Sequence, residues 1–137
     1  MITVFLDASG MVPMEVRRDQ WYPRLRRIVA GLRASSSNVT YISTNWTLYE
    51  ALAITQRAGK DRALALHARI TELANVITVS PEVEREALRR FLTWTDKGAS
   101  VVDHANLLVA QAQGCHAFIS FDDDFVPLVK GTGIRLL

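Results

Sequence analysis

The sequence has little of several features that mark particular classes of protein. Its 137 residues include a single cysteine, Cys115, which excludes an internal disulfide and any zinc module built from several cysteines. The opening apolar run, Ile2 to Leu6, stops at Asp7, and no run approaches the roughly 20 residues that a membrane span requires. No export signal is visible. We therefore expect a cytoplasmic protein that has no membrane partner.

The net charge is also small, and two known phosphate-binding motifs are missing. Sixteen lysines and arginines oppose fourteen acids, and the formal charge of +2 is too small to indicate nucleic-acid binding by itself. No Gly-x-Gly-x-x-Gly follows the first apolar run, which disfavours a Rossmann nucleotide binder. The stretch from Ala58 to Asp61 lacks the first glycine and the hydroxyl residue of a P-loop.

Apolar residues are plentiful enough for a core. They make up 49% of the chain against 22% charged residues, a balance that indicates one folded domain over residues 1–137 rather than disorder. Short β-branched or aromatic runs predict strands, and a fifth run at the end of the chain predicts one more. The runs are Ile2 to Leu6, Val39 to Ile42, Val76 to Val79, Ala117 to Phe121 and Ile134 to Leu137.

Segments with helical periodicity fill the gaps between these runs. One example is the apolar stripe Leu25, Ile28, Val29 and Leu32, and similar stripes follow each of the later runs. Strands that alternate with helices predict βα crossovers and a parallel sheet covered on both faces. We expect an α/β fold, a three-layer α/β/α sandwich around a central, mostly parallel sheet of four or five strands.

Acidic residues gather where such a sheet would place a functional site. Asp7 directly follows the first strand and Asp122 the fourth, while Glu50 and Asp103 enter from early turns of predicted helices. The carboxyl ends of parallel strands meet at one edge, where the loops and helix N-termini also converge. Carboxylates without thiolates or histidine pairs favour Mg²⁺ or Mn²⁺ over zinc.

Each acid also has a structural interpretation. Thr47-x-x-Glu50 matches a capping box and Ser100-x-x-Asp103 nearly does, so both acids could satisfy free amides at helix N-termini. Asp122 could cap a short helix, and Asp7 could occupy a turn. Capping does not explain why four acids would share one sheet edge, and that joint occurrence favours a metal site.

Four segments occur in a characteristic order: Val4 to Ser9, Ile42 to Leu52, Asp96 to Asp103 and Ala117 to Phe125. Together they resemble the PIN domain, a family of small metal-dependent ribonucleases that includes the VapC toxins of bacterial toxin–antitoxin pairs. Two departures from the family pattern are modest, Asp123 in place of a basic or polar residue and Asn106 in place of a small hydroxyl residue.

The resemblance implies a PIN-like fold and a site for Mg²⁺ or Mn²⁺. Its catalytic acids would be Asp7, Glu50, Asp103 and Asp122, with Asp96 and Asp124 as further metal ligands, and Ser9 would support Asp7 by hydrogen bonding. It also implies an endoribonuclease acting on single-stranded or structured RNA, an antitoxin protein that occludes the acidic groove, and a homodimer.

Other interpretations stay open at this point. An arginine-rich first quarter, interleaved with Trp21 and Tyr22, could contact RNA, a partner protein or only solvent. A PIN-like module that binds RNA or protein without catalysis would be expected to lack one of the acids, and none is missing. An aspartate-dependent phosphatase would need a second acid where Ser9 stands. The arginines concerned are Arg17, Arg18, Arg24, Arg26, Arg27 and Arg33.

Overall fold

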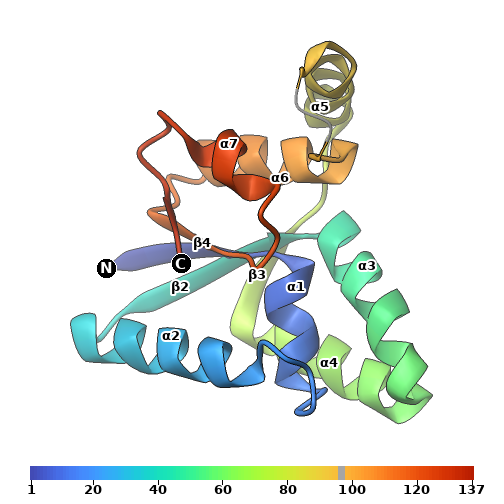
Figure 1. The fold of residues 1–137 in the computed structure, drawn as a ribbon, viewed down its shortest axis with the longest axis vertical. Helices are drawn as coiled ribbons and strands as arrows, with labels where there is room; N and C mark the ends of the chain where they lie inside the picture. Colours follow the sequence, from blue (N-terminus) through green and yellow to red (C-terminus); the bar gives the residue numbers. More distant parts are fainter. Residues whose placement is uncertain (96–97) are drawn as a thin grey trace.

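A computed structural model describes residues 1–95 and 98–137. Its centre is a five-stranded sheet in the order β3-β2-β1-β4-β5, and every neighbouring pair of strands is parallel (Figure 1). The strands are β1 (Ile2–Leu6), β2 (Val39–Thr44), β3 (Ala74–Ile77), β4 (Ala117–Ile119) and β5 (Arg135–Leu136).

Alternation of side chains along β1 divides the core into two. Val4 and Leu6 are fully buried against the helices on one face, while Phe5 between them is buried on the other. Phe5 packs there on Phe118 of β4, with ring centroids 4.7 Å apart. A strand that is apolar on both faces must be covered on both, which is why the chain forms three layers.

Helices cover the two faces unequally (Figure 1). Short α1 (Ala8–Met11) and η1 (Val12–Met14) pack on one face together with longer helices, while α6 and α7 cover the other and α5 lies outside them. The longer helices of the first layer are α2 (Tyr22–Ser35), α3 (Asn45–Thr55) and α4 (Lys60–Leu73), joined by η2 (Gln56–Ala58). The second layer contains α5 (Pro81–Thr93), α6 (Val101–Ala112) and α7 (Phe125–Val129).

The predicted α/β/α sandwich is confirmed, with the fifth strand present, but several local predictions are wrong. The fourth strand ends at Ile119 rather than at residue 121, so two residues separate it from Asp122. The third strand is Ala74–Ile77 rather than residues 76–79, because α4 ends at Leu73 and the chain turns straight into the sheet. Thr47 does not cap its helix: Thr44 is the N-cap and accepts a hydrogen bond from Thr47 N at 3.2 Å, so Glu50 lies in the helix interior. The Ser100–Asp103 capping box does form.

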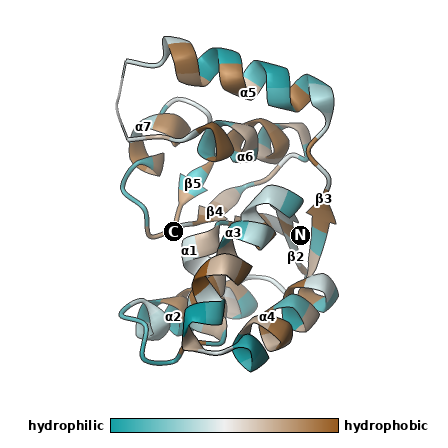
Figure 2. Ribbon diagram, turned by 90° about the vertical axis from the view of Figure 1, so that its right-hand side faces the viewer, coloured by the Kyte–Doolittle hydropathy of each residue, from teal (hydrophilic) through white to brown (hydrophobic). Residues whose placement is uncertain are grey.

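Within the described residues, no helix is both long and apolar enough to span a membrane. Hydropathy varies between the helices of the second layer (Figure 2). Buried α6 carries mostly apolar residues, whereas outer α5 alternates apolar and charged ones. Of the residues of α5, only Ala87 is fully buried, because α5 packs on α6 and not on the sheet.

Candidate active site

Asp7 lies at the carboxyl end of the central strand. Its side chain is 6% exposed and forms the N-cap of α1. Oδ2 accepts hydrogen bonds from Ser9 Oγ at 2.8 Å and from Ser120 Oγ at 3.0 Å. Ser9 therefore supports Asp7, as the resemblance implied. Burial nevertheless raises the pKa of Asp7, and these hydrogen bonds only oppose that effect.

The same two serines join the ends of β1 and β4. Ser9 Oγ accepts a hydrogen bond from Phe121 N at 2.9 Å, and Ser120 Oγ accepts one from Asp122 N at 3.2 Å. The backbone that carries Asp122 is thus held through two hydroxyl groups that also bind Asp7. Neighbouring parallel strands place the two aspartates at one sheet edge, and the serines fix their relative positions.

Glu50 and Asp103 approach this edge on two different helices. Glu50 is exposed on the second turn of α3, and Asp103 is 9% exposed in the first turn of α6. Asp103 Oδ2 accepts a hydrogen bond from Ser100 N at 2.9 Å, while Ser100 Oγ accepts one from Asp103 N at 3.1 Å. This reciprocal pair orients the Asp103 carboxylate.

A buried polar contact ties the two helices together below these acids. Asn106 Oδ1 accepts hydrogen bonds from Thr44 Oγ1 at 3.0 Å and from Thr47 Oγ1 at 2.9 Å. All three side chains are fully buried. Thr47 precedes Glu50 by one helical turn and Asn106 follows Asp103 by one turn, so the contact sets how α3 and α6 present their acids.

The four acids interact electrostatically. Partial burial raises the pKa of Glu50, and the negative charges of Asp7 and Asp122 raise it further. Burial, with the same two charges, raises the pKa of Asp103 to about 6. Residues from four separate segments therefore lie close enough for their charges to act on one another. A positive ion among them would relieve the repulsion.

The two remaining predicted ligands are Asp96 and Asp124. Asp96 lies outside the described residues. Asp124 is the N-cap of α7, its backbone N donates to Asp122 Oδ1 at 2.9 Å, and its carboxylate fills the space where a Cβ at Gly98 would lie. Asp124 therefore faces the connection between α5 and α6.

Two other residues with reactive side chains, Cys115 and His104, lie in the core. Cys115 is buried in the second core cluster, and burial raises the pKa of its thiol to about 11, so it is no nucleophile at neutral pH. His104 is 1% exposed and packs edge-on against Trp94, with ring centroids 5.1 Å apart. Although His104 is next to Asp103 in the sequence, its side chain packs between α5 and α6.

The donor set fits a hard divalent cation. Carboxylates and hydroxyls surround the edge, and oxygen ligands are those that Mg²⁺ and Mn²⁺ prefer. Over residues 1–95 and 98–137, no three histidine, cysteine, aspartate or glutamate side chains already stand in the arrangement of a metal site. The charges of the acids interact, but in the described residues their carboxylates do not converge on one point as metal ligands do.

Sequence reasoning missed part of this site. The sequence pattern places Ser120 within the fourth strand and gives it no role, yet its hydroxyl donates to Asp7 and the residue is 3% exposed. Thr44 and Thr47 were not connected to Asn106, because a contact over about 60 positions leaves no local pattern. The available signal was polarity: serine and threonine at strand ends within apolar runs are buried polar groups that require partners.

No family model and no curated protein matches the chain by sequence. Solved structures do match it. VapC20 of Mycobacterium tuberculosis, a toxin that cleaves the sarcin–ricin loop, has a TM-score of 0.79 at 22% identity, over 91% of this chain and 94% of that one. VapBC2 of Rickettsia felis, solved with a DNA fragment from its promoter, has a TM-score of 0.65 at 13% identity, covering 99% and 98%.

A third structure, PAE2754 of Pyrobaculum aerophilum, has a TM-score of 0.55 at 20% identity, over 98% of this chain and 89% of that one. All three likenesses extend over nearly the whole of each chain. The chain therefore has the fold of VapC proteins, and the predicted PIN-like architecture is confirmed.

Proposed function

We propose that the chain is a metal-dependent endoribonuclease of the VapC kind, the toxin of a toxin–antitoxin pair. The observation that carries the proposal is the electrostatic interaction of four acids at one edge of a VapC-like fold: the charges of Asp7 and Asp122 raise the pKa of both Glu50 and Asp103. VapC20, which shares this fold, is itself a toxin that cleaves the sarcin–ricin loop.

These four carboxylates would hold Mg²⁺ or Mn²⁺, with Asp96 and Asp124 as further ligands. When bound, the ion supplies positive charge that activates water and stabilises the negative charge developing on the phosphoryl group. Because the acids do not already converge, binding requires their side chains to draw together. Glu50, exposed at the rim, has the most freedom to do so.

The chain's own residues prepare this edge. Ser9 and Ser120 direct hydrogen bonds at one oxygen of Asp7, which fixes the rotamer of that carboxylate. The capping box does the same for Asp103. Without a cation, Asp103 with its pKa of about 6 holds a proton only below about pH 6, where a cation would have to compete with that proton.

Partners follow from the same proposal. An antitoxin protein would cover the acidic edge, as expected for a fold shared with the VapBC2 complex. A homodimer would use α5, whose outer face exposes Leu88, Phe91 and Leu92. Leu92 is 71% exposed, and exposed apolar side chains grouped on one helix face are typical of an interface. A second copy of the chain would cover it. The free, buried Cys115 fits a reducing cytoplasm.

The test is incubation of the purified chain with single-stranded RNA in Mg²⁺ or Mn²⁺. We expect cleavage that stops when a chelator is added and that is absent from the Asp103→Asn variant. Asp123→Asn is the matched control, because Asp123 is an exposed neighbour outside the set of four. Cleavage that persists in both the chelator and the Asp103→Asn variant would contradict the proposal, and binding without cleavage would favour a non-catalytic module.

A further inference from the structure

Six arginines line a continuous groove in the α1–α4 layer, outside the acidic edge. Two adjoining hollows of about 590 and 430 Å³ share Met14, Arg17 and Arg69. We call them together the arginine groove. It lies between the turn that follows η1, helix α2 and helix α4. Its arginines are Arg17, Arg18, Arg26, Arg33, Arg62 and Arg69.

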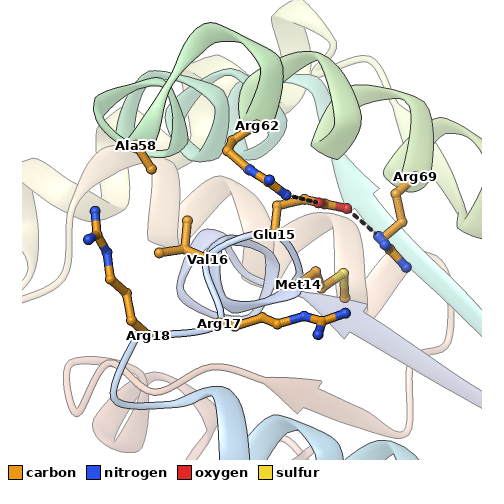
Figure 3. Close-up of a pocket in the computed structure, with 8 residues that line it drawn as sticks. All are labelled: Met14, Glu15, Val16, Arg17, Arg18, Ala58, Arg62 and Arg69. Atoms are coloured by element: carbon orange, nitrogen blue, oxygen red, sulfur yellow. Dashed lines mark hydrogen bonds and ion pairs between the residues drawn. The ribbon is translucent and has the colours of Figure 1, made fainter.

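Glu15 organises the inner part of this groove. Its side chain is 9% exposed, with Arg69 Nε at 2.7 Å and Arg62 Nη1 at 3.9 Å from its two carboxylate oxygens (Figure 3). A buried carboxylate between two guanidinium groups fixes their positions and neutralises only one charge. Asp61 offsets Arg62 further at the exposed rim, at 3.7 Å. Positive charge remains in large excess along the groove.

Arg17 and Arg18 are available to a ligand. Both are exposed, and within the described residues neither forms an ion pair. In Figure 3 the Arg18 side chain extends toward Ala58, while Arg17 extends past Met14 on the other side. Their fork-shaped donor groups suit phosphate oxygens, which accept two parallel hydrogen bonds from arginine.

An aromatic contact connects this segment to the acidic edge. Trp21 stacks on Phe121, with ring centroids 5.1 Å apart and planes at 18°, and the Arg24 guanidinium lies 5.5 Å from the Phe121 ring centre. Phe121 immediately precedes Asp122 and donates its backbone N–H to Ser9. The chain runs from Asp7 through α1 and η1 straight to Glu15, so one short segment carries both the first acid of the edge and the carboxylate at the centre of the groove.

We propose that the arginine groove binds the phosphate backbone of RNA that extends from the acidic edge, and so positions the strand for cleavage. The proposal rests on the proposed nuclease function. Charge spread over two hollows matches a polymer with one negative charge per nucleotide. Aromatic walls add to the match: Arg26 lies 5.8 Å from the ring centre of Tyr22, an arrangement typical of surfaces that combine stacking with backbone contacts.

The experiment measures RNA binding by the full chain in EDTA, so that neither cleavage nor a metal ion contributes. The probe is a fluorescein-labelled single-stranded RNA of about 20 nucleotides, followed by anisotropy over a series of salt concentrations. The test variant is Arg17→Ala/Arg18→Ala, which leaves the Glu15 ion pairs intact. The matched control is Arg85→Ala/Lys130→Ala, which removes two exposed charges from the opposite layer.

We expect the test variant to bind about tenfold more weakly and the slope of log K against log salt to fall by about 1.4, or 0.7 for each lost phosphate contact. The control should retain wild-type affinity and slope, and both variants should melt like the wild type. A second variant, Arg26→Ala/Arg33→Ala, should weaken binding similarly.

Two results would overturn the proposal: wild-type affinity and slope in the Arg17→Ala/Arg18→Ala variant, or tighter binding of a polyglutamate peptide of equal length, which would make the groove a protein-docking surface. The nuclease proposal fails independently. If the chain binds RNA through the groove but does not cleave it in Mn²⁺, the groove stands and the catalytic assignment falls.

Discussion

Asn106 Oδ1 accepts a hydrogen bond from Thr47 Oγ1 at 2.9 Å, which joins α6 to α3 beneath the acids that the two helices carry. Asn106 Nδ2 is buried and has no protein partner in the described part of the chain. The carbonyl oxygen alone thus provides the link, since Thr44 donates to the same atom at 3.0 Å. One amide oxygen of α6 thus accepts both hydrogen bonds that join Asn106 to the start of α3.

Replacing Thr47 with valine removes the hydroxyl and keeps the shape of the side chain. We expect the free energy of unfolding to fall by about 1–2 kcal/mol, because Asn106 Oδ1 loses one of two buried donors. RNA cleavage should fall further than stability explains, since Glu50 and Asp103 lose their fixed separation. Thr47→Ser, which retains the hydroxyl, should stay close to wild type in both urea unfolding and cleavage rate. Equal cleavage by both variants would contradict a positioning role.

Metal binding should stabilise the folded chain. At a Mn²⁺ concentration about 100 times Kd, the expected gain is about 2.7 kcal/mol, or a few degrees in Tm for a domain of this size. Asp7→Asn should melt higher than wild type without metal, because burial disfavours the Asp7 charge, and should not respond to Mn²⁺. Asp123→Asn should respond like wild type. A wild-type Tm that does not change with Mn²⁺ would contradict the proposed metal site.

The raised pKa of Asp103 predicts a pH-dependent stability. Burial and the charges of Asp7 and Asp122 raise this pKa from 3.8 to about 6, so the protonated form favours folding and its contribution is lost as pH rises through 6. Asp103→Asn should match wild-type stability below about pH 4 and exceed it by up to about 3 kcal/mol above pH 6.5. Urea unfolding in EDTA from pH 3.5 to 7.5 measures this. An unchanged difference across that range would argue against the raised pKa.

Cys115 should have no part in catalysis. Burial raises the pKa of its thiol to about 11, so little thiolate exists at pH 8. Iodoacetamide should modify the native chain slowly and the urea-unfolded chain rapidly, and Cys115→Ala should cleave RNA at the wild-type rate. Rapid native labelling with loss of cleavage would require a different active centre.

The parts of the fold that sequence predicts best are those with a local period. Alternating strands and helices indicated the parallel sheet, and Ile2–Leu6 appears with the predicted bounds. The start of β3 was missed because Ala74 and Asn75 carry no strand pattern, and their pairing with Tyr41 and Ile42 is decided by the sheet. Tertiary pairing overrides weak local preference there.

The site residues also divide into those that a local sequence pattern predicts and those that only the folded structure brings together. Asp7 and Asp122 could be chosen because each directly follows an apolar run in the sequence, and parallel strands bring such positions together. Capping is the competing interpretation, and the structure shows that capping does not remove these acids from the edge: Asp7 caps α1 and Asp103 completes a capping box, and the charge of Asp7 still raises the pKa of Asp103. Ser120 and Thr47 could not be assigned, because their partners lie far along the chain.

A crystal of the wild-type chain soaked in Mn²⁺, with anomalous data collected at the manganese edge, tests the shared-ion claim most directly. We expect an anomalous peak within ligand distance of carboxylate oxygens from Asp7, Glu50, Asp103 and Asp122, either directly or through one water, and no such peak in Asp103→Asn crystals. Manganese bound elsewhere on the chain, with this edge empty in the wild type, would contradict the claim.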